Sequence, residues 1–258
     1  MASILFEIKN SIAFITLNRP EKYNAFNREM ALLLQEKLDE CKKSKGVRCV
    51  YLTGAGKAFS TGQDLAEAAD PDGPEVSKIL LEHFNPIVIQ IRKLPKPVVA
   101  AVNGVAAGAG ANIALCCDVV VAAQSASFIQ AFSKVGLIPD SGGTFFLPRL
   151  IGWQKASALA MLGEKVDATE AERIGMIYKV FGDEIFSEEA VKLATTLSQM
   201  PTKGLALTKQ AFNQSFVGSY EEQLQDEEIL QQRAGATHDY KEGVQAFLEK
   251  RPPNFKGE

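Results

Sequence analysis

The chain has 258 residues, of which 46% are hydrophobic, so it can hold one large domain, or one domain with a small helical appendage, around a substantial core. A formal net charge of −3 gives no electrostatic reason to expect nucleic acid or an anionic membrane as a partner. Four cysteines without C-x-x-C spacing predict buried thiols in a reducing compartment. Without a basic segment followed by an apolar one at the N-terminus, we expect a cytoplasmic protein. With only His83 and His238, neither a metal site nor a histidine-based triad is expected.

The first part of the chain predicts crossover units of strands and helices. Alternating apolar residues at 4–8, followed by a turn and an apolar run at 12–17, predict a β-hairpin. Apolar residues at helical spacing over 27–45 predict a helix, and the run at 47–53 predicts a strand. The order β-β-α-β indicates an α/β fold.

Two glycine-rich junctions each follow a strand and precede a helix. The first covers 54–65, and the second is Gly108-Ala109-Gly110, between a predicted strand at 98–102 and an apolar run at 111–117. Such junctions leave backbone N–H groups free, and small residues let a ligand atom approach them closely. Two junctions of this kind could point two donors at one oxygen, as an oxyanion hole requires. Alternatively, the glycines only allow helices to pack on their strands.

Asp140 is the single carboxylate in the apolar stretch from 127 to 146, which follows a predicted strand at 119–122. Burial there would raise its pKa from about 3.9 and make the carboxylate a competent proton shuttle. The alternative is that Asp140 caps the helix that begins at 141–143.

The remainder of the chain is mostly helical. Between the two junctions a helix is predicted at 76–94, and after Trp153 helices are predicted at 156–163, 168–175, 187–200, 201–216, 220–235 and 239–250. We expect this helical tail to pack on the core or on a neighbouring subunit.

Several motifs occur together and in a fixed order. They are Leu17–Pro20 with Asn24–Phe26, Gly56–Leu65, Lys96–Val98, Asn103–Gly110, Gly136–Gly143 and Phe247–Arg251. In these segments the chain resembles the crotonase family, the enoyl-CoA hydratase/isomerase superfamily, over essentially its whole length. The resemblance implies an α/β fold, a crotonase-like spiral of ββα units, with a core at 1–200 that holds CoA and the active site. It also implies a C-terminal helical trimerisation region at 201–258, and a homotrimer or a dimer of trimers.

The resemblance also implies a site for an acyl-CoA substrate, with CoA as part of the substrate and no further cofactor. The thioester oxygen would lie between the backbone N–H groups of Gln63 and Ala109, and Asp140 would be the acid–base residue. Residues implied to bind CoA are Lys57, Ala58, Ser60, Thr61, Gly62, Gln63 and Asp64, with Phe247 and Lys250 reaching the CoA of an adjacent subunit. Residues implied for the acyl pocket are Leu65, Gly108, Asn112, Phe132 and Ile138.

Departures from the family pattern favour isomerisation. Hydratases of the family carry two glutamates that activate water, and Asn112 and Phe132 occupy those positions here, so we expect poor hydration. The segments 84–86, 131–134 and 239–244 resemble isomerases of the family. This resemblance implies conversion of ring-1,2-epoxyphenylacetyl-CoA to oxepin-CoA, or a Δ3-to-Δ2 shift in an enoyl-CoA, through a thioester enolate. The alternatives are a hydratase of broad specificity and a non-catalytic family member that binds CoA or RNA.

Overall fold

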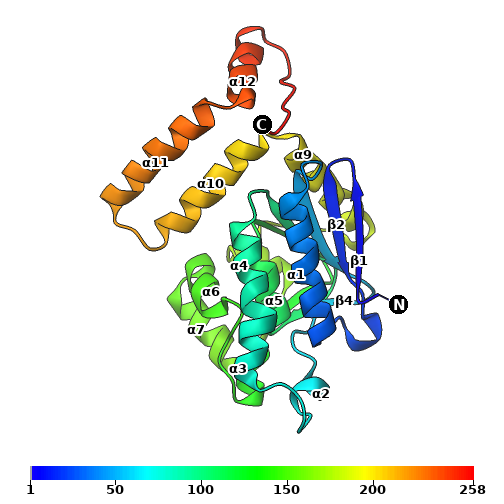
Figure 1. Cartoon of the computed structure of the whole chain (residues 1–258). Coiled ribbons are helices and arrows are strands. Elements are labelled where there is room, and N and C mark those ends of the chain that lie inside the picture. Colours follow the sequence, from blue (N-terminus) through cyan, green and yellow to red (C-terminus); the bar gives the residue numbers. More distant parts are fainter. Residues whose placement is uncertain (1) are drawn as a thin grey trace.

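The computed structural model describes residues 2–258 and contains two sheets (Figure 1). The six-stranded sheet has the order β1-β2-β3-β5-β7-β10, and the four-stranded sheet has the order β4-β6-β8-β9. The strands are β1 (Ile4–Lys9), β2 (Ile12–Leu17), β3 (Cys49–Gly54), β4 (Ala58–Ser60), β5 (Val98–Val102), β6 (Val105–Ala107), β7 (Val119–Ala123), β8 (Ser127–Ile129), β9 (Lys165–Asp167) and β10 (Lys179–Phe181).

A repeated unit connects the two sheets. In each of the pairs β3–β4, β5–β6 and β7–β8, the first strand joins the larger sheet and the second joins the smaller one. Helical segments follow each pair, so the chain winds as a spiral of ββα units. Strands β2, β3, β5, β7 and β10 pair in parallel, and only the β1–β2 hairpin of the larger sheet is antiparallel. The predicted α/β spiral and its opening hairpin are therefore confirmed.

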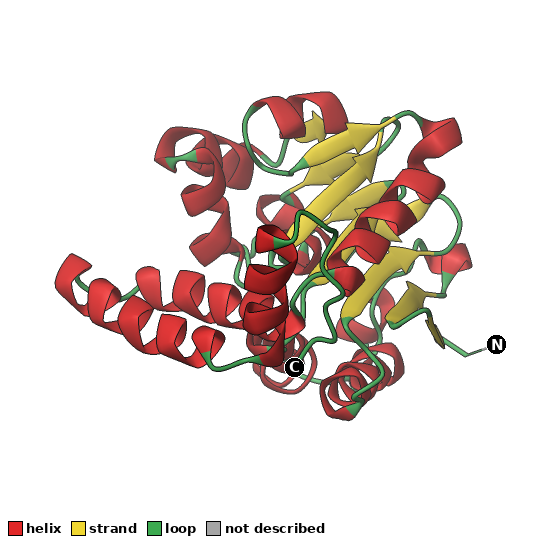
Figure 2. Ribbon diagram, turned by 90° about the horizontal axis from the view of Figure 1, so that it is seen from above, coloured by secondary structure: helices red, strands yellow, loops and turns green. Residues whose placement is uncertain are grey.

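Helices cover both faces of the larger sheet (Figure 2). They are α1 (Arg28–Lys43), α2 (Leu65–Ala68), α3 (Val76–Ile79), α4 (Asn85–Lys93), α5 (Ala109–Leu115), α6 (Gly143–Ile151), α7 (Trp153–Leu162), α8 (Ala168–Arg173), α9 (Asp183–Gln199), α10 (Thr202–Ser215), α11 (Tyr220–Gly235) and α12 (His238–Leu248). Strand β5 is buried along its whole length, as its unbroken apolar sequence predicts. All four cysteines are buried and free, which confirms that part of the prediction.

The predicted helix at 76–94 contains a π-helical turn, η2, over Leu80–Phe84, between α3 and α4. Pro86 has no N–H to donate to the carbonyl of Glu82, four residues earlier. The Gln35 side chain of α1 supplies the missing donor, because its Nε2 donates to the carbonyl oxygens of Glu82 (2.7 Å) and His83 (3.1 Å). The helix therefore widens at this point instead of ending.

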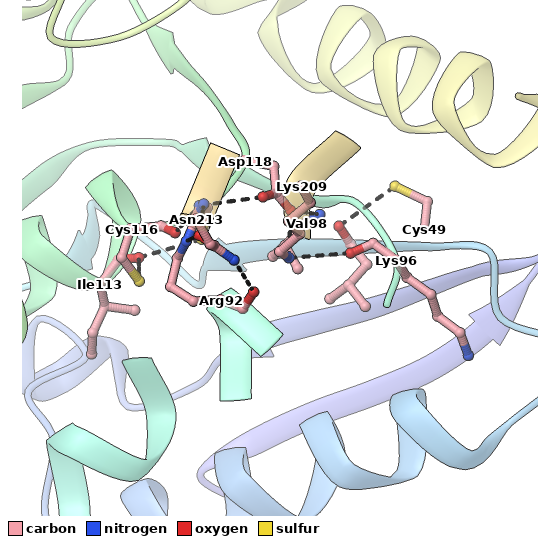
Figure 3. Close-up of polar contacts among 11 residues, drawn as sticks. Cys49, Arg92, Lys96, Val98, Ile113, Cys116, Asp118, Lys209 and Asn213 are labelled. Carbon is pink, nitrogen blue, oxygen red and sulfur yellow. Dashed lines mark hydrogen bonds and ion pairs between the residues drawn. The ribbon is translucent and has the colours of Figure 1, made fainter. Parts of the chain in front are cut away.

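The C-terminal hairpin of α10 and α11 projects from the body of the molecule (Figures 1 and 2). A polar cluster fastens α10 to the core, as Figure 3 shows. The Asp118 carboxylate, between α5 and β7, accepts from Lys209 Nζ (2.7 Å), Arg92 NH1 (3.3 Å) and the Val98 backbone N–H (2.8 Å). Asn213 Oδ1 accepts from Arg92 NH2 (2.6 Å). Burial lowers the pKa of Lys209, and Asp118 partly opposes that effect.

We predict that Asp118→Asn destabilises the protein, because Arg92 and Lys209 then lose their shared counter-ion. For a largely buried cluster with one partner removed, the free energy of unfolding should fall by about 2–4 kcal/mol, measured by urea denaturation. Asp39→Asn is the control, since Asp39 pairs with Lys43 on an exposed face of α1 and should change little. Equal effects of the two substitutions would contradict the assigned role of the cluster.

Candidate active site

The candidate site lies at one edge of the four-stranded sheet. Strands β4, β6 and β8 are parallel neighbours, so their carboxyl ends meet at the same edge. Residues following these three ends include Gln63, Ala109 and Asp140, respectively. The parallel pairing thus gathers three residues that are far apart in the sequence.

The backbones next to Gln63 and Ala109 lie close together. A Cβ atom built on Gly62 would be 3.0 Å from the Ala109 nitrogen and 3.1 Å from the Ala107 oxygen. Gly62 has φ +84° and Gly108 has φ +54°, backbone conformations that favour glycine. The glycines thus have a specific role, beyond packing helices on strands: they allow this close approach.

Both backbone N–H groups are free to bind a ligand. Ala109 is the first residue of α5, so its N–H has no partner within the helix. Gln63 forms a parallel bridge with Phe26, in which Phe26 N donates to Gly62 O and Asp64 N donates to Phe26 O. Neither the Gln63 nor the Ala109 N–H donates to another residue within the described range 2–258. Two such donors can stabilise negative charge on one oxygen.

Asp140 lies in a tight loop before α6 and does not cap that helix. The cap residue is Gly142, and no side chain accepts a hydrogen bond there. The Asp140 carboxylate instead accepts from Ser141 Oγ at 2.8 Å. Burial raises the pKa of Asp140, and the Ser141 hydroxyl lowers it to a smaller extent. The helix-cap alternative for Asp140 was therefore wrong.

Asn112 holds the Asp140 loop against α5. Its Nδ2 donates to the Asp140 carbonyl oxygen (2.9 Å), and its Oδ1 accepts from Gln130 Nε2 (2.8 Å). Asn112 is 1% exposed, and both its amide nitrogen and its amide oxygen are bonded to protein groups. A Cβ on Gly143 would lie 2.2 Å from Asn112 Nδ2, so only glycine leaves room for this contact. Because Asn112 lies one turn after Ala109, the contact ties the carboxylate loop to the start of α5.

The other residues predicted for the acyl pocket differ in exposure. Phe132 is buried, and its Cζ atom lies 3.9 Å from the position of a Cβ on Gly108, so its ring faces that glycine. Leu65 is 58% exposed and Ile138 is 77% exposed. Within one chain these two apolar side chains are therefore exposed to solvent.

Several side chains of the segment predicted to bind CoA are already buried or hydrogen-bonded within the protein. Ser60 is fully buried, and its hydroxyl donates to the Asn24 carbonyl at 2.8 Å. The Asp64 carboxylate accepts from the Ala66 N–H at 3.1 Å and pairs with Arg19 at 3.0 Å. Ala58 is buried in β4, whereas Lys57 is exposed. Contacts from this segment to a ligand would therefore come from backbone atoms, Lys57 and Thr61.

Phe247 and Lys250 are not brought to this site within one chain. They lie at the end of α12 and just after it, at the opposite end of the molecule from α2 (Figure 1). The C-terminal tail fixes α12, because the buried Asp239 carboxylate accepts from the backbone N–H groups of Lys256 and Gly257, each at 2.7 Å. The Phe247 side chain is 82% exposed.

Three supporting residues were missed from the sequence: Gln130, Ser141 and Gly143. The sequence holds no signal for Gln130, because its partner is 18 positions away. Ser141 adjoins Asp140, and its φ of +51° is a backbone feature that composition does not reveal. Within residues 2–258, no group of three or more histidine, cysteine, aspartate or glutamate side chains is placed to hold a metal ion. No helix of the same range is both long and apolar enough to span a bilayer.

Comparison with known proteins shows the family. The model of the enoyl-CoA hydratase/isomerase family matches residues 7–258, and this chain belongs to that family. It is similar to the 1,2-epoxyphenylacetyl-CoA isomerase of Escherichia coli K12, with 47% identity over 100% of this chain and 99% of the relative. It is also 44% identical to a Rhodobacter capsulatus protein named "Probable enoyl-CoA hydratase", over 99% and 98% of the two chains. The crystal structure of an enoyl-CoA hydratase from Bacillus anthracis matches with TM-score 0.92 and 33% identity, over 99% of this chain and 100% of that one.

We predict that Gly62→Ala lowers kcat/KM at least 100-fold with the fold retained, because the added methyl group forces the two N–H donors apart. The measurement is steady-state turnover of an enoyl-CoA, with a thermal melt on the same sample. Gly136→Ala is the matched control: its φ is +73°, but nothing lies within 4 Å of the added Cβ. If the two variants lose activity equally, backbone strain rather than the spacing of the donors is responsible.

Proposed function

We propose that this protein is an acyl-CoA isomerase that uses one carboxylate to move a proton within its substrate. The N–H groups of Gln63 and Ala109 polarise the thioester carbonyl and stabilise the enolate that forms when a neighbouring C–H bond is broken. Asp140 takes that proton and returns it to another carbon of the same substrate, from C2 to C4 in a β,γ-enoyl-CoA. For a ring epoxide of phenylacetyl-CoA, the same electron flow through the thioester favours rearrangement to the seven-membered oxepin.

The observation that carries this proposal is the contrast between Asp140 and the two positions that hold glutamates in hydratases. Burial raises the pKa of Asp140 towards the range in which a carboxyl group both takes and gives a proton. Phe132 has no titratable group, and the Asn112 amide is already bonded at both ends. Neither residue can activate a water molecule, so proton transfer within the substrate is favoured over addition of water.

The proposed substrate class rests on the position of Phe132 and on the comparisons. The E. coli relative is named for 1,2-epoxyphenylacetyl-CoA, and the aromatic Phe132 beside Gly108 suits a ring-bearing acyl group. The R. capsulatus relative carries a hydratase name. A hydratase is therefore the second candidate, and gain of one water by crotonyl-CoA would identify it.

We further propose that the protein is cytoplasmic and works as a homotrimer or a dimer of trimers. The projecting α10–α11 hairpin exposes large apolar side chains, including Phe212 (62%), Val217 (82%) and Tyr220 (73%). Exposed apolar groups gathered on one projection are typical of an interface. Phe247 and Lys250 would then reach the CoA of a neighbouring subunit.

Asp140→Asn should abolish isomerisation, with at least a 1000-fold loss of kcat, while Kd for the CoA thioester changes less than about threefold. The measurement is a mass- and absorbance-resolved assay with 3-hexenoyl-CoA and with the phenylacetyl-CoA epoxide. Asp72→Asn, in the exposed loop before α3, is the control and should retain full activity. Unchanged turnover in Asp140→Asn would refute the proposal.

A pH profile tests whether Asp140 acts as the base. Its active form is the carboxylate, so kcat/KM should fall as the pH drops through the raised pKa. The Ser141 hydroxyl stabilises the carboxylate, so its removal in Ser141→Gly should raise the pKa further and move the acidic limb to higher pH. Glycine also tolerates the positive φ of this position. An acidic limb that does not move would assign it to another group.

A further inference from the structure

A pair of buried amide side chains, Gln130 and Asn112, leads to Asp140. Gln130 directly follows strand β8 and is 4% exposed, and its Nε2 donates to Asn112 Oδ1 at 2.8 Å. The other end of the Asn112 amide donates from Nδ2 to the Asp140 carbonyl oxygen at 2.9 Å. Two hydrogen bonds in series therefore connect Gln130, which has no part in the proton transfer described above, to the residue that carries the acid–base group.

The Asp140 carbonyl oxygen determines the orientation of both amides. A carbonyl oxygen only accepts hydrogen bonds, so Asn112 must turn its nitrogen towards Asp140 and its oxygen towards Gln130. Gln130 must then present its own nitrogen to Asn112. Packing against Gly143 does not make this choice, because Asn112 Nδ2 and Oδ1 both lie close to the position of a Cβ on Gly143, at 2.2 and 2.9 Å. The hydrogen bond from Gln130 therefore favours the orientation of Asn112 that holds Asp140.

The oxygen of the Gln130 amide has no comparable partner. Within residues 2–258, Gln130 Oε1 is buried and accepts no hydrogen bond. An unpaired buried acceptor is unfavourable, so its presence requires a reason. The bond to Asn112 is the one hydrogen bond that the Gln130 side chain makes in this range, which indicates that its donor is the group that matters.

The turn that carries Asp140 needs support from the surrounding structure. The Gly143 N–H closes it by donating to the Asp140 carbonyl oxygen at 2.8 Å, and its two central residues have positive φ, +51° at Ser141 and +79° at Gly142. Glycine adopts this conformation readily, whereas serine does so only where neighbouring groups hold it. Asn112 Nδ2 is the second donor on the same carbonyl oxygen. Without that donor the turn can relax, and the Asp140 carboxyl group moves with it.

We propose that Gln130 is a positioning residue for the acid–base group: by orienting the Asn112 amide, it holds the Asp140 turn and so keeps the carboxyl group in place for proton transfer. Gln130 touches no reacting atom and acts only through Asn112. This inference rests on the proposed isomerase function and adds the residue that fixes its single carboxylate. Loss of the Gln130 donor should lower kcat with little effect on KM, because the segment predicted to bind CoA follows a different strand.

The first test is the pH profile of Gln130→Glu, which keeps the size and shape of the side chain. Below its pKa the new carboxyl group is protonated and donates to Asn112 Oδ1, as the amide does. Above its pKa it only accepts, so Asn112 turns and releases the Asp140 carbonyl. The variant should therefore show an alkaline limb in kcat for 3-hexenoyl-CoA that the wild-type protein lacks in the same pH range. The loss should reach about 10- to 100-fold, with KM changed less than about threefold.

Two charged groups bear on the titration of this new carboxyl group. Lys134, four residues after Gln130, has its Cε atom 3.0 Å from the position of a Cβ on Gly163, and the Gln130 carbonyl oxygen lies 3.4 Å from the same position. The ammonium group lowers the pKa of the new carboxyl group, and burial raises it, so together they set the midpoint of the alkaline limb. The Asp140 carboxylate is the second group, and repulsion from it would move only the acidic limb of the profile to higher pH. The alkaline limb therefore carries the test.

Further variants separate a role through Asn112 from a general effect on the fold. Gln130→Met removes the donor at every pH and should lower kcat by about 10- to 100-fold without an alkaline limb. Made in the Asn112→Ala background, the same substitution should have no further effect on kcat, because the two residues act in series. Gln90→Met is the matched control, since Gln90 on α4 also has a buried side-chain oxygen without a partner in the described chain. It should keep the wild-type kcat.

A titration that needs no turnover separates this inference from the proposed function. Carbon-13 NMR of the aspartate carboxyl groups gives the pKa of Asp140, whose signal is assigned by its absence in Asp140→Asn. Burial raises this pKa in the wild-type protein, so release of the turn towards solvent in Gln130→Met should move it back towards about 3.9. The shift is expected even if the protein converts neither proposed substrate.

A wild-type pH profile in Gln130→Glu would overturn the proposal, and so would a loss of kcat that is the same at every pH. An unchanged Asp140 pKa in Gln130→Met would also overturn it, as would a further loss of kcat from this substitution in the Asn112→Ala background. If Gln130→Met fails to fold, the alkaline loss of activity in Gln130→Glu supplies the same test, provided that activity returns when the pH is lowered again.

Discussion

Parallel pairing of three very short strands is the constraint on which the site depends. Each of β4, β6 and β8 has only three residues, yet their pairing fixes where the three following loops begin. The loops themselves have little regular structure, so the sheet edge supplies the rigidity that they lack. Gly108 shows how closely loop and sheet are joined, since its N–H donates to the carbonyl oxygen of Ile129, the last residue of β8, at 2.9 Å. A loop whose first residue is fixed to the sheet in this way can present backbone donors to a ligand without a large loss of loop conformational entropy on binding.

Much of the architecture was predictable because the spacing of apolar residues along the sequence indicates the helices and strands. The hairpin, α1, β3 and β5 follow from patterns of four or more residues, and each was found where the pattern indicated. The four short strands of the smaller sheet were not predicted as strands, because three residues cannot establish a period of two. The π-helical turn was also missed, since the sequence predicts one continuous helix over 76–94, and the donor that compensates for Pro86 comes from Gln35, far away in the sequence.

The residues of the candidate site could be predicted from the sequence, but the contacts that support them could not. Asp140 could be singled out because an isolated carboxylate in an apolar stretch is visible in the sequence, whereas Gln63 and Ala109 were implied by the resemblance to the family. The residues that surround Asp140 could not be predicted from the sequence. The contact between Asn112 and the Asp140 carbonyl joins residues 28 positions apart, and it exists because Gly143 has no side chain. Such contacts are properties of packing, and no local sequence pattern encodes them. The division at residue 200 and the trimeric assembly stay predictions, because one chain shows neither.

The Asn112 amide also limits how such a protein can change its chemistry. A glutamate at that position would add a carboxylate, but it would have to occupy space already filled against Gly143 and would remove the donor that holds the Asp140 carbonyl. A carboxylate introduced at position 112 would therefore also change the position of Asp140, because it would release the loop that carries that residue.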